Sequence, residues 1–545
     1  MRFYAPWTLA LCAGLGLGGC NLAPEYQRPA MATPEAFKEA AGAGSEIAKA
    51  ADKKPAPGEP QWFSSDPADL RPRGPWWSVF KDQTLDGLEA RVRPGNQDVA
   101  AALATMDQAR AFAARSMAGL SPAVNMGGQI SANKQSTHRP MRTSNDLPTS
   151  TDYVRDALSH GLPINEPDHY GDNQLGLQAS YEIDLWGRVR NIAAAGATQA
   201  EASEADLAAI ELSIEAELAR DYVALEGLDA EIALLRDIAA SYAGTLDLTR
   251  KRVNGGIASP ADESRARAQL EFVKAQIPDL QERRALLEHA IATLVGTSAS
   301  GFSLPAKGRF VASPRIPLGA PSQLLERRPD IAAAERRVAS ANRTIGVARA
   351  AFFPRFTINL SGGTQDTGIS LFNWRNSVWS LGPTMTLPIF DGGLHAADLR
   401  AAEAAYLQAV AQYRGQVLRA IQEVEDALAQ INYLAREAKE IAAAVAATGK
   451  TLDIAIKLYT EGAVNYIEVE TAQSDSLQAR RQAVTLNTRR VQASLALIVA
   501  FGGGWSSPEF TPVEPEQPCS VCELATAAVD ARVVPDIPAQ VGATP

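Results

Sequence analysis

The stretch "YEIDLWGRVRNIAAAG", from Tyr181 to Gly196, decides the fold because it joins two kinds of secondary structure without a loop between them. Up to Leu185, apolar and polar residues alternate with the period of a half-buried β-strand. From Arg188 to Val253 the sequence contains no proline, which indicates one long helix. We place the junction at Trp186 and Gly187, because glycine tolerates the dihedrals that an abrupt change of chain direction requires.

The same arrangement occurs again in "TMTLPIFDGGLHAADLRAAEA", from Thr384 to Ala404. The residues of this second junction are Asp391, Gly392 and Gly393. Long helices are therefore expected over about 188–253 and about 394–461. At ~1.5 Å per residue each would extend ~100 Å, which is too long for a compact domain. Their apolar residues are spaced by threes and fours, as in a coiled coil.

Further landmarks indicate an internal twofold repeat. Asp98 and Pro122 correspond, at one constant offset, to Asp330 and Pro354. Each of the two prolines ends a helix just before a strand begins. Each half of the body is thus expected to contain a helix, two strands separated by a loop, the long helix, a turn and a shorter helix.

The strands are expected at about 123–131 and 174–185 in the first half, and at about 356–363 and 377–389 in the second. Their lengths approach the ~9–11 residues with which a tilted strand crosses a bilayer. Alternating faces also suit a soluble, half-buried sheet. Two hairpins leave their edges open, so either sister chains or a soluble sandwich must complete them. Pro278 is expected to kink or interrupt the shorter helix of the first half.

The N-terminal sequence "MRFYAPWTLALCAGLGLGGC" has an early positive charge, an apolar stretch and small residues, as a secretory signal does. Its end, "LGGC", resembles a bacterial lipobox, which implies lipid attachment at Cys20. The alternative is an ordinary signal peptide with an incidental cysteine. Asn21 is not the aspartate associated with retention in the inner membrane, so sorting to the outer membrane is implied. No stretch long enough for a membrane-spanning helix follows.

Composition excludes several classes of function. The net charge of −10 provides no basic surface for nucleic acid. The histidines show no ligand spacing, and no phosphate-binding glycine loop is present; an enzyme, a metal site and a cofactor other than the covalent lipid are therefore not expected. The five histidines are His138, His160, His169, His289 and His395. Cys519 and Cys522 favour a disulfide or a bystander pair over a metal site.

Six motifs carry a resemblance to a known family. They are "CNLAPEYQRP", "PWWSVFKDQTLDGL", "ERRPDIAAAE", "ARAAFFPRF", "LPIFDGG" and "VAFGGGW". Together they cover the body of the chain in order and resemble the outer-membrane factor family of TolC-like channels, in its OprM/NodT-type lipoprotein branch.

The resemblance implies a mixed α/β, mainly α, fold and a homotrimer in the outer membrane. Each chain would supply four membrane strands to a twelve-strand barrel that continues into a long α-helical coiled-coil tunnel in the periplasm. Such a channel docks on a periplasmic adaptor (membrane fusion) protein and an RND-type inner-membrane pump, and exports small toxic compounds in multidrug resistance. Two alternatives are the outer-membrane channel of a type I protein secretion system and a structural coiled-coil envelope lipoprotein. The second would not explain the repeated strand pairs.

The expected organisation has five parts. They are a lipoprotein signal peptide (1–19), a lipid-anchored tether (20–75), a first repeat (76–320), a second repeat (321–508) and a Pro-rich tail (509–545).

The resemblance also implies a periplasmic gate at the helix turns. Asp262 and Tyr459 match members of a gate-locking network, and Glu468 matches an inward-facing carboxylate ring. Val464 and Thr471 depart from the family pattern, where an arginine and an acidic residue are common, so a closed state based on packing and hydrogen bonds is expected. The alternatives are that Asp262 only caps its helix and that Glu468 is a solvated residue favoured by the helix dipole.

Overall fold

The structure is a computed structural model that describes residues 20–31, 34, 37–39, 75–134, 169–307, 327–368 and 370–504. The signal peptide, the C-terminal tail with Cys519 and Cys522, and the loop over 135–168 lie outside the described residues.

The described elements follow one order in both halves. The first half contains η2 (Trp76–Phe80), α4 (Gln83–Gly95), α5 (Gln97–Ala118), β1 (Ala123–Lys134), β2 (His169–Ile183), α7 (Arg188–Asn254), α8 (Pro260–Leu294) and η3 (Ala299–Gly301). The second half contains α10 (Pro329–Ala350), β3 (Arg355–Asp366), η5 (Trp374–Asn376), β4 (Ser377–Thr386), α11 (Leu394–Glu461) and α12 (Tyr466–Ala500). The helix, strand, strand, long helix and shorter helix of α5–β1–β2–α7–α8 thus recur as α10–β3–β4–α11–α12.

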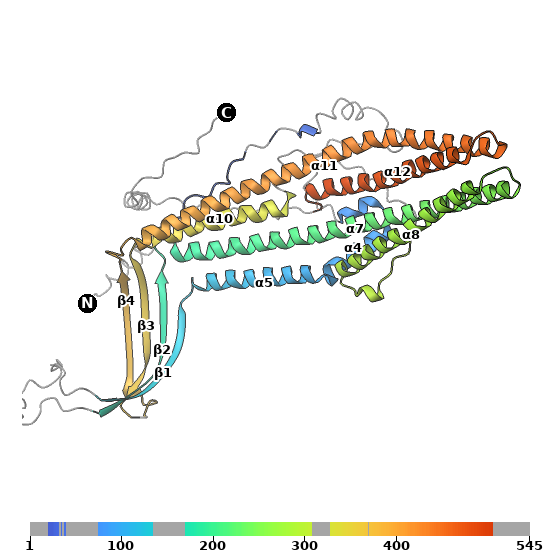
Figure 1. Ribbon diagram of the computed structural model, residues 1–545. Helices are drawn as coiled ribbons and strands as arrows, with labels where there is room; N and C mark the ends of the chain where they lie inside the picture. Colours follow the sequence, from blue (N-terminus) through green and yellow to red (C-terminus); the bar gives the residue numbers. More distant parts are fainter. Residues whose placement is uncertain are drawn as a thin grey trace, which may run out of the picture.

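The molecule is elongated, with the strands at one end and the helices running away from them (Figure 1). The two long helices begin at glycines in the left-handed region, Gly187 with φ 75° and Gly393 with φ 92°. Their bounds differ from the expected ranges by at most one residue. At their far end, α7 turns into α8 and α11 turns into α12, so four helices meet in a tip. None of the described helices combines the length and hydropathy of a membrane span.

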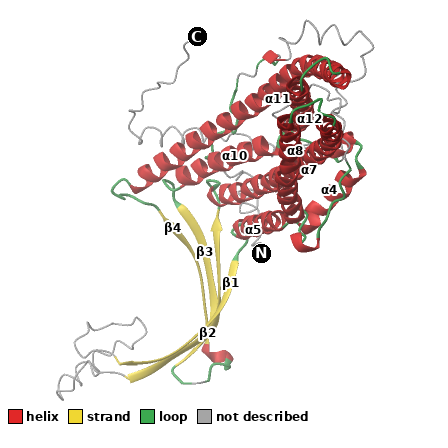
Figure 2. Ribbon diagram, turned by 45° about the vertical axis from the view of Figure 1, so that its right-hand side comes forward, coloured by secondary structure: helices red, strands yellow, loops and turns green. Residues whose placement is uncertain are grey.

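The four strands form one antiparallel sheet in the order β1-β2-β3-β4, which extends away from the helices (Figure 2). The register places Met126 opposite Leu177, Leu177 opposite Gly362, and Gly362 opposite Trp379, so that these residues share one face. This face is apolar and solvent-exposed in the single chain: Met126 is 70% and Trp379 81% exposed. No described strand pairs with the outer edge of β1 or of β4.

The opposite face of the sheet is polar. The Ser180 hydroxyl lies 3.1 Å from Asn359 Oδ1, and the Asn359 amide donates to the Thr384 hydroxyl at 3.2 Å. The sheet therefore separates an apolar from a polar surface, as the alternation predicted. β4 ends at Thr386 rather than near residue 389, because Pro388 cannot donate a ladder hydrogen bond.

Two expectations need correction. Pro278 was expected to kink or interrupt its helix; it does not interrupt α8, which is continuous from Pro260 to Leu294. The Pro278 ring lies on the exposed side of the helix, where water can satisfy the carbonyl that loses its partner.

The segment after Cys20 was expected to be a loose tether, but its described residues are docked on α10 and α11. Arg28 pairs with Glu335 of α10 at 2.9 Å. The backbone N–H groups of Lys38 and Glu39 donate to the Glu425 carboxylate of α11 at 2.7 and 3.0 Å. No local pattern of residues indicates these contacts, because the partners lie more than three hundred residues away along the chain.

Candidate functional site

The tip of the helices contains the predicted gate residues. The turn between α11 and α12 begins at Gly462, whose φ is 84°, and the turn between α7 and α8 contains Gly256 with φ 69°. Apolar side chains are exposed in or beside both turns: Ile257 is 69% exposed, and Ile467, in the first turn of α12, is 49% exposed. Exposed apolar residues in such positions are suited to contact with another molecule.

Tyr459, in the last turn of α11, is the centre of a buried cluster. Its hydroxyl lies 3.3 Å from the Thr249 hydroxyl of α7, and its ring meets the Tyr466 ring edge-on at 5.8 Å. The Arg252 guanidinium of α7 lies 4.7 Å from the centroid of the Tyr459 ring. Nη1 of Arg252 also donates to the backbone carbonyls of Tyr459 and Thr460 at 2.6 and 3.2 Å. We call Thr249, Arg252, Tyr459 and Tyr466 the tip cluster.

The tip cluster links α7 to α11 and α12 by hydrogen bonds and aromatic packing. Burial, and then the nearby Glu470 carboxylate, raise the pKa of Tyr466, so its hydroxyl stays neutral. Val464 packs, partly buried, against the apolar core of the tip. The Thr471 hydroxyl donates to the Ile467 carbonyl at 2.9 Å. Within this chain, the helices of the tip are therefore held together by packing and hydrogen bonds, and a gate at this place stays a prediction.

Asp262 lies in the first turn of α8 and forms a capping box with Ser259. The Ser259 N–H donates to Asp262 Oδ2 at 3.2 Å, and Ser259 Oγ accepts from the Ala261 N–H at 3.2 Å. The capping contact of Asp262 is therefore present, and within this chain no hydrogen bond joins its carboxylate to Tyr459 among the described residues; its role in a gate stays a prediction.

Glu468 lies in the first turn of α12 and is exposed. Among the described residues, no hydrogen bond or ion pair to its carboxylate is present. In the single chain its position agrees with a solvated residue that the helix dipole favours.

Arg252 is the tip residue that the sequence analysis missed. It is basic and lies in the last turn of α7, three residues before Gly255, where a helix dipole favours a cation. The charge and position of Arg252 could be read from the sequence. Its hydrogen-bond acceptors could not, because they lie on α11, 207 and 208 residues away.

The first strand–helix junction is packed. The Trp186 indole N–H donates to the Pro354 carbonyl at 2.8 Å, and its ring lies 4.8 Å from that of Phe353. A Cβ on Gly187 would lie 3.1 Å from the Cys20 carbonyl oxygen. The junction thus touches both the start of β3 and the start of the docked N-terminal segment.

Cys20, the predicted lipid-bearing residue, lies at this junction and is 8% exposed. Its carbonyl accepts from Arg190 at 3.3 Å, and Asn21 Oδ1 accepts from the Asn191 amide at 2.8 Å.

The second junction is capped but open. Asp391 Oδ1 accepts from the Gly393 N–H and Oδ2 from the His395 N–H, both at 2.9 Å. The His395 and Gly393 N–H groups hold the pKa of Asp391 below its usual range. A Cβ on Gly392, whose φ is 65°, would meet nothing within 4 Å. Pro122 directly precedes β1, and Pro354 directly precedes β3.

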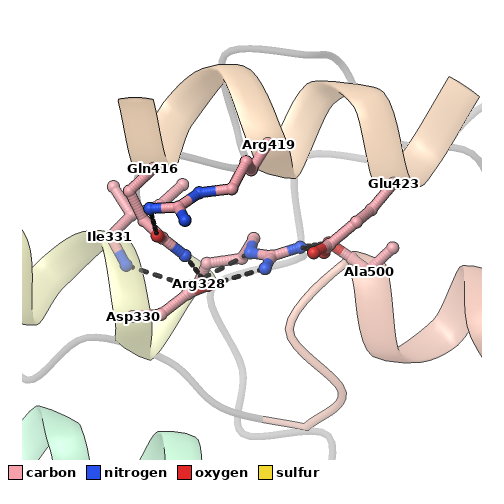
Figure 3. A network of polar contacts seen from close by, with 7 residues as sticks. All are labelled: Arg328, Asp330, Ile331, Gln416, Arg419, Glu423 and Ala500. Carbon is pink, nitrogen blue, oxygen red and sulfur yellow. Dashed lines mark hydrogen bonds and ion pairs between the residues drawn. The ribbon is translucent and has the colours of Figure 1, made fainter. Parts of the chain in front are cut away.

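A second arginine network joins α10, α11 and α12 at the end of α12 away from the tip (Figure 3). Arg328, 7% exposed, makes a bidentate pair with Asp330 at 3.1 and 2.6 Å. Its Nη1 donates to Glu423 of α11 at 2.5 Å and to the Ala500 carbonyl of α12 at 3.1 Å. Gln416 completes the network with a bond to Asp330 at 2.6 Å.

Comparisons with known proteins identify the class. The outer membrane efflux protein family matches residues 90–297 and 320–503. The chain is 31% identical over 508 residues to the outer membrane protein OprJ of Pseudomonas aeruginosa, covering 93% of this chain and 97% of OprJ. It is 28% identical over 501 residues to the cation efflux system protein CusC of Escherichia coli K12, covering 91% and 99%.

The solved structure of the outer-membrane channel OprN superposes with a TM-score of 0.76 at 26% identity, covering 89% of this chain and all of that one. That of CusC gives 0.73 at 26% identity with the same coverage. The chain therefore belongs to the outer membrane efflux protein family. Its mainly helical fold with a few strands is that of the solved TolC-like channels.

Proposed function

We propose that the chain is the outer-membrane exit duct of a tripartite efflux system, and that it passes small toxic compounds from an inner-membrane pump to the exterior. The observation that carries this proposal is a sheet with an exposed apolar face, a polar opposite face and two open edges, joined by short glycine-containing linkers to helices ~100 Å long. An isolated apolar face of this kind needs lipid to cover it. The proposal involves no catalytic step and no resident cofactor beyond a covalent lipid.

The functional unit in this proposal is a homotrimer. The helices pack in the order α5, α7, α10, α11, which parallels the strand order, so α5 and α11 are the outer members of one layer. Both carry exposed apolar side chains: Leu103 and Phe112 on α5, and Leu407 and Leu418 on α11. A second copy that covers α5 and β1 with its own α11 and β4 pairs one edge of each chain, and three copies arranged in this way pair every edge and close a twelve-strand barrel. The detergent-solubilised protein should have the mass of three chains; a monodisperse monomer would contradict the trimer.

The lipid at Cys20 anchors the docked N-terminal segment at the level of the first junction, where strands end and helices begin. A multi-chain acyl group binds firmly, since each buried methylene contributes ~0.8 kcal/mol. Cells fed labelled palmitate should label the wild-type chain and not Cys20→Ala. Label retained by Cys20→Ala would refute the assignment.

The partners in this proposal are a periplasmic adaptor and an RND-type pump. The names of relatives include a cation efflux system protein and a pyoverdine export outer membrane protein, so the class of cargo is small and varied. A photo-crosslinking probe at Ala463, in the α11–α12 turn, should capture the adaptor in intact cells. A probe at Met126, on the apolar face of the sheet, is the control and should capture no periplasmic protein. Failure to capture an adaptor from Ala463 would remove the docking role of the tip.

Glu468 is proposed to form the entrance ring. Three copies of an exposed carboxylate around one axis would attract cations into a narrow pore, because like charges focus the potential there. Glu468→Gln should lower cation over anion selectivity of the purified channel in planar bilayers. An unchanged reversal potential would leave Glu468 as a solvated surface residue.

A further inference from the structure

The connection between β3 and β4 is an ordered loop at the end of the sheet that lies away from the helices (Figure 2). Its described residues are 367, 368 and 370–376, of which the last three form η5. Asp366 Oδ2 accepts from the Ser370 N–H at 3.0 Å, and the Asn376 amide donates to the Ser370 carbonyl at 3.1 Å. Asn373 Oδ1 accepts from the Arg375 N–H at 3.1 Å. These bonds define the backbone from which the side chains of the β3–β4 loop project.

The β3–β4 loop lies over the apolar face of the sheet and not over the polar face. Asn173 shares the apolar face with Leu177, because side chains alternate along β2. Its amide donates to the Gly368 carbonyl at 2.6 Å. A Cβ on Gly171, on the same face, would collide with the Thr367 carbonyl oxygen. The loop therefore covers the end of the apolar face away from the helices, and it leaves Asn173 only 7% exposed.

The loop also lies at the height where the apolar face ends. Asn173 and Asp366, which are paired across β2 and β3, are polar residues on this face beneath the loop. Ile183, at the other end of β2, is ten residues from Asn173. At ~3.3 Å per residue and a strand tilt of ~40°, this separation corresponds to ~25 Å, the height of the apolar band of an outer-membrane barrel. Irregular backbone is not found exposed to lipid hydrocarbon, so in the proposed channel the loop occupies the headgroup layer.

The side chains that the loop exposes are two aromatic rings and a cation. Phe372 is 93% and Trp374 85% exposed. Arg375 is exposed, and no carboxylate of the described residues forms an ion pair with it. Aromatic rings favour the headgroup level of a bilayer, and a planar guanidinium binds phosphate oxygens in a bidentate manner. The three side chains thus match the two parts of a phosphorylated lipid, its acyl chains and its anionic headgroup.

The other charges at this end of the sheet favour an anionic ligand. Lys134, the last residue of β1, is exposed and lies on the apolar side of the sheet. In the proposed trimer, β1 of a neighbouring copy lies beside β4 and adds this second cation to the edge that carries Arg375. Two carboxylates at this end face other groups. Asp366 is half-buried under the loop on the Ser370 N–H, and Asp172, on the polar face, accepts from the Gln365 amide at 2.8 Å.

We propose that the β3–β4 loop binds the phosphorylated headgroup of a lipid in the outer leaflet of the membrane. Arg375 contacts the phosphate, and Phe372 and Trp374 pack against the start of the acyl chains. The inference rests on the proposed outer-membrane function and assigns a lipid ligand to the outer rim of the sheet. A lipid bound there fixes the height of the sheet in the membrane at the end opposite the lipid on Cys20.

The test compares binding of lipid A, which carries phosphate groups, with binding of the same lipid after enzymatic dephosphorylation. Both are added to the detergent-solubilised full-length chain and measured by native mass spectrometry. The wild type should bind lipid A about tenfold more tightly than the dephosphorylated form, equivalent to ~1.4 kcal/mol. Arg375→Gln should lose most of this preference. Arg375→Lys should keep part of it, because lysine retains the charge without the planar fork.

A matched control and a competitor sharpen the test. Arg236, exposed on α7 far from the sheet, is the control, and Arg236→Gln should keep the wild-type preference. Equal binding of the two lipids by the wild type, or an unchanged preference in Arg375→Gln, would overturn the site. Excess inorganic phosphate should leave lipid A bound. Complete displacement by phosphate would make the loop a site for free phosphate and contradict the lipid ligand.

Photo-crosslinking in intact cells separates the lipid site from the proposed outer-membrane function. An aromatic probe replaces Phe372 in the loop or Leu381, which is 61% exposed on the apolar face. Lipid captured at both positions is the expected result. Lipid captured at Leu381 alone, or a protein captured at Phe372, would refute the headgroup site and leave the membrane placement of the sheet intact. Lipid captured at neither position would refute that placement itself.

Discussion

The two strand–helix junctions have the same plan in sequence and opposite surroundings in space. At the first, Trp186 bonds to the Pro354 carbonyl and Gly187 lies against Cys20. At the second, Phe390 is 91% exposed and Gly392 has open space around it. β2 is an inner strand and β4 an outer one, which accounts for the closer packing of the first junction among the described residues. In the proposed trimer, the open junction lies at the edge that a second copy would cover.

The largest expected effect comes from adding a Cβ at the first junction. Gly187→Ala places an L-residue at φ 75° and puts its Cβ 3.1 Å from a backbone oxygen. The left-handed strain costs ~1–2 kcal/mol and the crowding ~1–3 kcal/mol. Gly392→Ala has the strain without the crowding. Thermal unfolding should therefore show a clearly larger loss for Gly187→Ala, and equal losses would break the comparison.

A smaller effect is expected from the aromatic residues of the two junctions. Trp186→Phe removes the donor to the Pro354 carbonyl, which should lower the free energy of unfolding by ~1–2 kcal/mol. Phe390→Leu changes a side chain without contacts in the chain and should cost less than ~0.5 kcal/mol in the dissociated chain. If Phe390→Leu instead weakens the assembled trimer, measured by its mass on dilution, the open junction is an inter-chain contact.

The smallest effect concerns the cap of the second junction. Because the folded-state pKa of Asp391 is depressed by the N–H groups of His395 and Gly393, its ionised form stabilises the start of α11. This stabilisation is present above the unfolded pKa and is lost as the pH falls through the folded pKa. Exchange of the His395 amide should thus be faster in Asp391→Ala than in the wild type at neutral pH. The two should converge in acid, and a difference that persists there would contradict the assignment.

Much of the fold could be predicted from sequence because its signals are local. The alternation before Leu185 and the proline-free run after Arg188 report on backbone geometry within a few residues. For this reason α7 and α11 begin and end within one residue of expectation. Strand ends were less exact, since hydrogen-bond pairing with a neighbouring strand sets them, as at Thr386 of β4.

The candidate site was predictable only in part. Tyr459 could be named, but its partners Thr249 and Arg252 lie on another helix about two hundred residues away. From the sequence Asp262 could cap its helix or take part in a gate; the structure shows the capping contact, and the gate role stays a prediction. Pro278 looked disruptive because sequence does not reveal which side of a helix faces water.

The order of strands and helices and the positions of the strand–helix junctions follow from the sequence alone, because hydrophobic periodicity and the backbone preferences of glycine and proline are local properties. Three features became visible only in the folded chain: the packing of the first junction, the openness of the second, and the docking of the segment after Cys20 on α10 and α11. The contacts of α11 with Glu423–Arg328 at one end and with Arg252 through backbone carbonyls at the other are of the same kind. These features depend on which segments, distant in the sequence, come into contact, because burial and ion pairing are determined by those contacts.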